Sequence, residues 1–152
     1  MEFLSELHPR VVHFPIAFFI LYFIFETSGI VLKKDFLQKG SLLILIFGVG
    51  TALLSVLTGN QAQAMADLRF PENIEFNRLI EVHREYATVT MWYFSLIMIL
   101  RIYVVIKKKF VGNLMYVFIL FGLIGCILVY LTGIYGGDLV FKHGIGTQIL
   151  GK

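Results

Sequence analysis

The stretch VVHFPIAFFILYFIFETSGIVL, residues 11–32, decides the fold, because it is apolar over its whole length except for one charged residue, Glu26. A helix needs about 20 such residues to cross a hydrocarbon core about 30 Å thick. Three further stretches are long and apolar enough: residues 41–57, 87–106 and 112–134. The chain is 58% hydrophobic with a mean hydropathy of +0.82, well outside the range of soluble domains. We predict one all-α domain over residues 1–152, an integral membrane four-helix bundle.

The remaining global features of the chain exclude several classes of protein. The first span is too long for the apolar region of a secretory signal, and acidic residues precede it, so we expect it to be retained. The single cysteine, Cys126, lies within the last span and allows no intramolecular disulfide. The net charge of +3 gives no indication of nucleic-acid binding. The sequence has no CxxCH, no phosphate-binding loop and no nucleophile–base arrangement, so covalent haem and hydrolytic chemistry are not expected.

The charges between the spans predict the orientation of the bundle. The two short turns hold six lysines and one acid, namely Lys33, Lys34, Asp35, Lys39, Lys107, Lys108 and Lys109. The opposite side carries six basic and eight acidic residues. Basic residues in short loops favour the cytoplasmic side of a membrane. We therefore expect a bacterial inner-membrane protein with both lysine turns in the cytoplasm and both termini outside.

All four histidines fall on the side opposite the lysine turns. His8 and His13 precede the first span, His83 precedes the third, and His143 follows the fourth. Pro15 is expected to hold Phe14 extended and to start the helix, which would place His13 just outside the first turn on a stiff backbone. His83 shares its helical face with apolar neighbours in IEVHREYATV and is expected to point toward protein.

The two halves of the chain resemble each other. Leu57-Thr58-Gly59 ends the second span and Leu131-Thr132-Gly133 ends the fourth, and each is followed by a DLxF sequence, at residues 67–70 and 138–141. A parallel duplication predicts two helical hairpins related by a pseudo-two-fold axis along the membrane normal. Such an axis would place His13 opposite His83. The alternative is a chance match between short apolar motifs.

A matched pair of imidazoles suits the two axial positions of a haem iron, with ligands carried on facing helices. We expect His13 and His83 to be the axial ligands of a b-type haem, with His8 and His143 ligating a second haem or bonding to propionates. Glycines of the second and fourth spans would let a flat ring or a neighbouring backbone approach closely: Gly48, Gly50, Gly59, Gly122, Gly125 and Gly133. Two alternatives stay open. The same four histidines suit zinc or copper, or they cap and anchor the helices of a structural subunit.

Three motifs carry a resemblance to a known family. HPRVVHFPIAF at the start, a histidine heading the third span, and TGIYGGDLVFKHGIG at the end are similar to the bacterial membrane-protein family catalogued as domain of unknown function 2231. The resemblance covers essentially the whole chain and implies that His8, His13, His83 and His143 all belong to the family motif. Members resemble domains joined to c-type cytochrome modules. This analogy implies an electron-transfer protein, rather than a stand-alone enzyme, with a c-type cytochrome or quinol as partner, in a homo-oligomer or larger respiratory complex.

Two charged residues lie within the spans, and one polar segment joins the halves. For Arg101 we expect snorkelling to the interface beside Lys107, the alternative being an ion pair with Glu26. The acid-rich segment 60–86 is expected to be a solvated loop, with NIEFNRLIEVHREY forming a helical extension of the third span. It is also a candidate docking surface for a basic cytochrome.

Overall fold

The computed structural model describes residues 2–69 and 74–143. Within these residues it has no strand and five helices: α1 (Glu2–Val11), α2 (His13–Val31), α3 (Asp35–Arg69), α4 (Ile74–Ile106) and α5 (Asn113–His143). Four segments are long and apolar enough to cross a membrane: Ser5–Val31, Asp35–Leu68, Ile74–Ile106 and Asn113–Lys142. The first of them combines most of α1 with α2. The expected all-α membrane fold with four spans is confirmed.

Several helices extend beyond the apolar stretches. The helix α4 begins at Ile74, as expected for a helical extension of the third span. The segment that directly follows Gly59, expected as a loop, instead continues α3 to Arg69, because QAQAMADLR consists of good helix formers. The GGDLVFKH sequence is likewise helical in α5, where Gly136 packs against a side chain of α4. Residues 144–152 lie outside the described residues.

The opening of the chain is helical, which corrects the expected placement of His13. The helix α1 ends at Val11, Val12 has helical dihedral angles, and α2 begins at His13. Phe14 is therefore helical instead of extended. Pro15 is tolerated as the third residue of α2 because the first-turn N–H groups of a helix have no partner within it. His13 is exposed on the first turn of α2.

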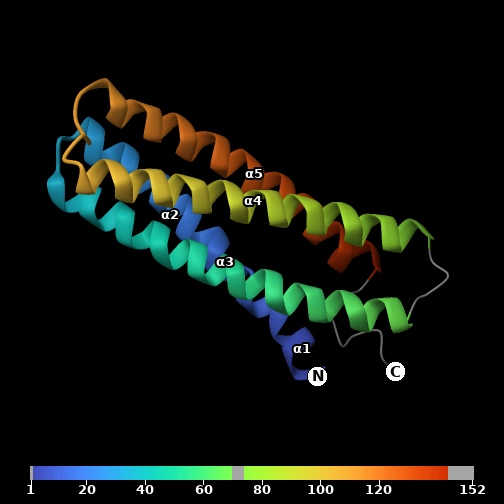
Figure 1. Ribbon diagram of the computed structural model, residues 1–152. Coiled ribbons are helices and arrows are strands. Elements are labelled where there is room, and N and C mark those ends of the chain that lie inside the picture. Colours follow the sequence, from blue (N-terminus) through green and yellow to red (C-terminus); the bar gives the residue numbers. More distant parts are fainter. Residues whose placement is uncertain (1, 70–73, 144–152) are drawn as a thin grey trace.

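The helices form a bundle in which α2 and α4 face each other diagonally (Figure 1). The helix α2 packs on α3 and α5, and α4 packs on the same two helices. At the centre, the rings of Phe19 from α2 and Phe94 from α4 stack with centroids 3.7 Å apart and planes 4° apart. Both rings are buried. This aromatic contact fixes the separation of the two diagonal helices at mid-bundle.

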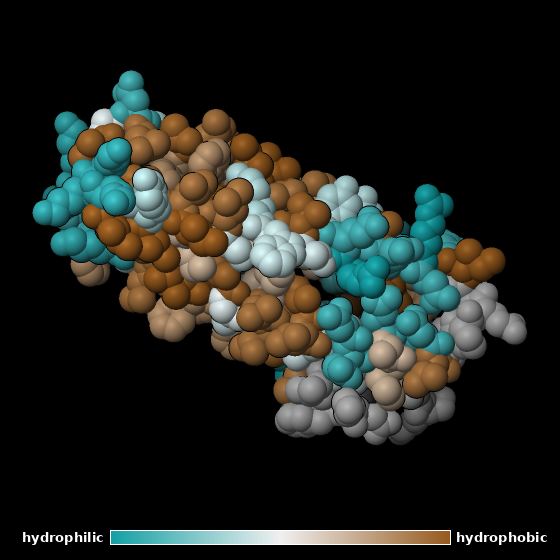
Figure 2. Space-filling model, viewed as in Figure 1, coloured by the Kyte–Doolittle hydropathy of each residue, from teal (hydrophilic) through white to brown (hydrophobic). Residues whose placement is uncertain are grey.

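The outer surface of the bundle is apolar along most of its length. Figure 2 shows brown hydrophobic side chains over the body of the molecule and hydrophilic ones gathered toward both ends. Large apolar residues of every span are exposed, among them Ile24, Leu53, Ile99 and Ile127. In water such a surface would be a large exposed patch, whereas in a bilayer it meets lipid. The protein therefore contacts membrane lipid through this belt.

The two lysine turns have the same backbone geometry. Lys33 and Lys108 each have φ of 53°, in the left-handed region. The N–H of the next residue donates to a carbonyl five residues back at 2.9 Å in both turns, Lys34 to Gly29 and Lys109 to Val104. Left-handed residues followed by such bonds commonly close helices. Corresponding residues of the two turns, such as Lys33 and Lys108, are 75 positions apart in the sequence. Glu26 and Arg101 are separated by the same number of positions.

Candidate functional site

His8 lies on α1, and its imidazole contacts the end of the second membrane span. Its Nδ1 lies 3.1 Å from the hydroxyl of Thr58 on α3. That hydroxyl donates to backbone carbonyls of Leu54 and Ser55, at 3.0 Å each. Because the hydroxyl proton is used there, the oxygen accepts a hydrogen bond from Nδ1 of His8.

His83 lies on α4, and its imidazole contacts α5 in a similar way. Its Nδ1 lies 3.1 Å from the carbonyl oxygen of Thr132. A carbonyl only accepts, so Nδ1 of His83 is the donor. The hydroxyl of Thr132 in turn lies 3.0 Å from that of Thr90 on α4. Tyr86, one helical turn after His83 on α4, stacks on Tyr135 of α5 with ring centroids 5.0 Å apart. These contacts fix the side of α4 that carries His83 against α5.

The two hydrogen bonds set the same tautomer in both imidazoles. With Nδ1 donating, the uncharged ring carries a lone pair on Nε2. A backbone carbonyl that accepts from Nδ1 is a common second-shell partner of a histidine whose Nε2 binds a metal. The tautomer set by these bonds makes Nε2 the candidate ligand atom of each ring.

His8 on α1 and His83 near the start of α4 both belong to the end of the bundle opposite the lysine turns (Figure 1). They are also separated by 75 positions, as Glu26 and Arg101 are. Their acceptors come from the repeated Leu-Thr-Gly sequences that end the second and fourth spans. The structure therefore matches His83 with His8, whereas the sequence led us to match it with His13.

The other two histidines are placed differently. His13 is exposed on α2 and makes no hydrogen bond with any described residue. His143 ends α5, and its side chain lies outside the described part of the structure. Among the side chains that are described, no group of three or more His, Cys, Asp or Glu residues could hold a metal ion.

Two glycines admit the imidazoles to their positions. A Cβ built on Gly59 would lie 2.9 Å from Cε1 of His8, and one on Gly136 would lie 2.9 Å from Cε1 of His83. Gly133, which matches Gly59 in the repeated sequence, faces open space. The expected close approach of rings to glycines is thus present, but the rings are the protein's own. Gly48 similarly contacts Phe19, and Gly125 contacts Phe94.

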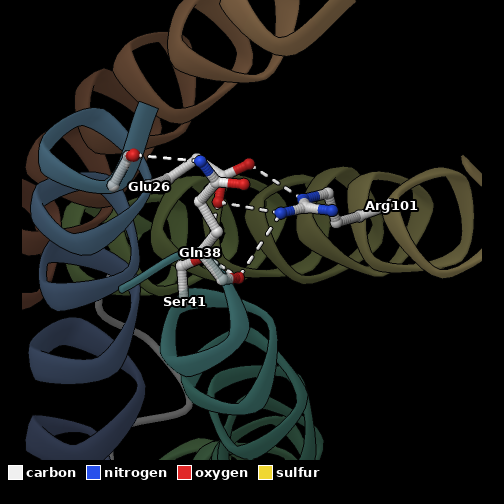
Figure 3. A network of polar contacts seen from close by, with 5 residues as sticks. Glu26, Gln38, Ser41 and Arg101 are labelled. Atoms are coloured by element: carbon white, nitrogen blue, oxygen red, sulfur yellow. Dashed lines mark hydrogen bonds and ion pairs between the residues drawn. The ribbon is translucent and has the colours of Figure 1, made fainter. Parts of the chain in front are cut away.

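A second polar cluster lies near the lysine turns and was only partly expected. Figure 3 shows Arg101 reaching from α4 toward Glu26 of α2 and the start of α3. Its Nε donates to Oε1 of Glu26 at 2.8 Å. Ser41 donates to the other carboxylate oxygen. Arg101 is 1% and Glu26 0% exposed, so the expectation that Arg101 snorkels to the interface is wrong and the ion pair is present.

The cluster is closed by aromatic and backbone contacts. The guanidinium carbon of Arg101 lies 3.2 Å from the ring centre of Phe110, a cation–π contact. Its Nη2 lies 3.4 Å from the carbonyl oxygen of Gln38, whose amide donates to Gly29. Glu26 and Arg101 occupy matching positions of the two diagonal helices. The ion pair therefore links the two halves of the bundle at one end, whereas at the other end each histidine bonds within its own half.

Fold and site together define an integral membrane protein of four spans with two inward, tautomer-fixed histidines at one end of the bundle. The chain belongs to the family described as predicted membrane protein DUF2231, whose model matches residues 5–149. The resemblance seen in the sequence is thereby confirmed. No curated protein and no solved structure matches the chain.

Proposed function

We propose that the chain is a membrane b-type cytochrome that binds one haem between His8 and His83 and transfers electrons at the histidine end of the bundle. The observation that carries this proposal is the shared tautomer: both Nδ1 atoms donate, so both Nε2 lone pairs are available. His8 comes from α1 and His83 from α4, at the same end of the bundle. Axial haem ligands of helix bundles are likewise carried on separate helices.

The donor set fits haem better than a protein-bound zinc ion. A zinc site needs three or four protein ligands, and no such group exists among the described side chains. A bis-histidine haem needs two. Copper held by the same two imidazoles is the competing candidate, because imidazole suits that ion as well. His13 is exposed and is assigned no ligand role. A second haem would need His143 and is not part of this proposal.

The chain's own residues would hold and tune the cofactor. His8 and His83 would bind the iron, and Thr58 and Thr132 would orient the rings through the Nδ1 bonds. When bound, the haem supplies a one-electron couple. Apolar side chains around the haem would limit the access of water and so influence its potential. We further propose that the lysine turns face the cytoplasm of a bacterial cell, so that the site exchanges electrons at the outer face with a quinol or c-type cytochrome.

The visible spectrum of the purified protein tests the assignment. Protein expressed with ample haem should show a reducible Soret band and a sharp low-spin α band, typical of bis-histidine iron. Metal analysis of the same sample distinguishes the haem proposal from the copper alternative. Copper without porphyrin would support the copper site and contradict the haem. Protein that contains neither haem nor copper would support the alternative that the chain is a structural subunit.

The glycines beside the imidazoles give a local test. Gly59→Ala and Gly136→Ala each place a methyl 2.9 Å from a histidine Cε1, so the ring must shift from its acceptor. We expect haem affinity to fall about 10- to 100-fold, the effect typical of disturbing a second-shell partner. Gly133→Ala, with open space around it, should bind haem as the wild type does. Haem titration of the three purified variants measures this, and equal affinities would place the cofactor elsewhere.

A further inference from the structure

A groove of about 590 Å³ lies between α3 and α4, beside the proposed haem site. Its α4 wall starts at Arg84, directly after His83, and runs to Trp92. Its α3 wall includes Val56 and Asn60, on either side of Thr58, the partner of His8. The groove therefore lies at the level of the two proposed ligands along the bundle, although neither His8 nor His83 lines it.

Polarity changes along the groove in the same direction on both walls. The helices α3 and α4 run in opposite directions, so Asn60 and Arg84 lie nearer the aqueous end, while Val56 and Trp92 lie deeper. Glu85 joins the polar end. The deep end opens to lipid, since the side chain of Trp92 is 66% exposed. A ligand that fits has a polar head at the membrane edge and an apolar remainder in the bilayer.

We propose that this groove binds the head group of a membrane quinol and that Glu85 accepts a proton from it as the quinol is oxidised. The inference rests on the proposed haem, which receives the electrons. The guanidinium of Arg84 and the carboxylate of Glu85 together carry no net charge, which suits an uncharged head group. A phospholipid phosphate would lie against the carboxylate of Glu85 and be repelled. The Asn60 amide can bond to a ring oxygen in either redox state.

The reaction balances with the groups present. Two O–H bonds of the quinol break and two C=O bonds form, releasing two electrons and two protons. The two electrons would leave one at a time through the haem that His8 and His83 are proposed to hold, and a c-type cytochrome at the outer face would accept them. One proton goes to the carboxylate of Glu85 and the other to water at the membrane edge. Glu85 is exposed and can return its proton to solvent.

Binding is measured independently of haem through Trp92, the sole tryptophan of the chain. The purified full-length protein in nanodiscs is titrated with a short-chain quinone, which quenches tryptophan fluorescence on contact. We expect saturable quenching in the wild type. Asn60→Leu should weaken it about tenfold, the loss that corresponds to one hydrogen bond worth about 1.4 kcal/mol.

A matched control separates binding from collisions in the lipid. Tyr130 of α5 is 68% exposed, and like Trp92 it lies two residues toward the lysine end from the Thr90–Thr132 hydrogen bond. The variant Trp92→Phe with Tyr130→Trp therefore carries its tryptophan at the same depth, away from the groove. It should show only linear, unsaturable quenching. The same linear quenching in the wild type would overturn the quinol site, whatever the haem content.

Haem reduction by a short-chain quinol tests Glu85. Glu85→Gln should slow reduction at least tenfold with an unchanged haem spectrum, because the proton acceptor is lost. Glu75→Gln, which changes an exposed carboxylate of α4 that does not line the groove, should be reduced at the wild-type rate. Equal rates in both variants would remove Glu85 from the reaction. Wild-type protein that binds quinone saturably but contains no haem would instead contradict the proposed function and the electron path, and leave the groove as a quinone-binding site.

Discussion

Alanine in place of His8 or of His83 is expected to abolish the low-spin α band of the protein. Each substitution removes one axial nitrogen, which leaves a high-spin or empty site. The effect should be equal in the two variants, because the imidazoles have matching positions, matching tautomers and acceptors in matching sequences. Reduced-minus-oxidised difference spectra of the purified variants measure it.

His13→Ala is the matched control for this experiment. His13 lies five positions from His8 on the same span but is exposed. The His13→Ala variant should keep the complete wild-type spectrum. Loss of the α band in His13→Ala, with retention in His8→Ala, would restore the pairing of His13 with His83 that the sequence favoured. Circular dichroism of each variant verifies that the helices are intact.

Breaking the ion pair of Glu26 and Arg101 should give the largest loss of stability of any single substitution in the chain. Removing one partner leaves the other charge buried and uncompensated, a cost of about 3–5 kcal/mol. Glu26→Leu and Arg101→Leu are therefore each expected to lower the unfolding midpoint strongly in thermal or denaturant unfolding in detergent. The double variant should be more stable than either single variant, because no unpaired charge remains.

An exposed pair on α4 serves as the comparison. Arg84 and Glu81 lie 3.9 Å apart with side chains 51% and 62% exposed. Such pairs contribute at most about 1 kcal/mol, so Glu81→Gln should leave the midpoint nearly unchanged. If Arg101→Leu proved as mild as Glu81→Gln, the pair would not hold the two halves together. If the double variant were less stable than both single variants, the cluster would depend on contacts other than the pair.

The buried pair also bears on specificity. The two halves of the bundle have matching turns and matching central aromatic residues, so identical halves could also associate with a second copy of the chain. Contact between a first half and a second half brings the carboxylate of Glu26 against the guanidinium of Arg101, which is favourable. Contact between two identical halves would bury two charges of the same sign, which is unfavourable. Glu26 and Arg101 therefore favour pairing of the two halves of one chain.

The spans, the lysine turns and the histidine end of the bundle could all be predicted from the sequence. Transfer of an apolar segment into lipid depends on its own length and composition, and the charge bias of short loops is likewise local. The extension of α4 to Ile74 could also be predicted, from the helical pattern of residues 73–86. The repeated Leu-Thr-Gly sequences were recognised only as a repeat, and the structure shows that they hold the acceptors of the imidazoles.

The tertiary structure alone decided which side chains meet. The sequence favoured His13 as the partner of His83, because Pro15 was expected to hold Phe14 extended and to start the helix, and it gave His8 only a secondary role. The bond from His8 to Thr58 joins residues 50 positions apart, and the ion pair of Glu26 with Arg101 joins residues 75 apart. Such contacts depend on the rotation of each helix about its axis and on its depth relative to its neighbours. Both are set by the close packing of rings against glycines and against each other, as at Phe19 and Phe94, and no local pattern specifies them.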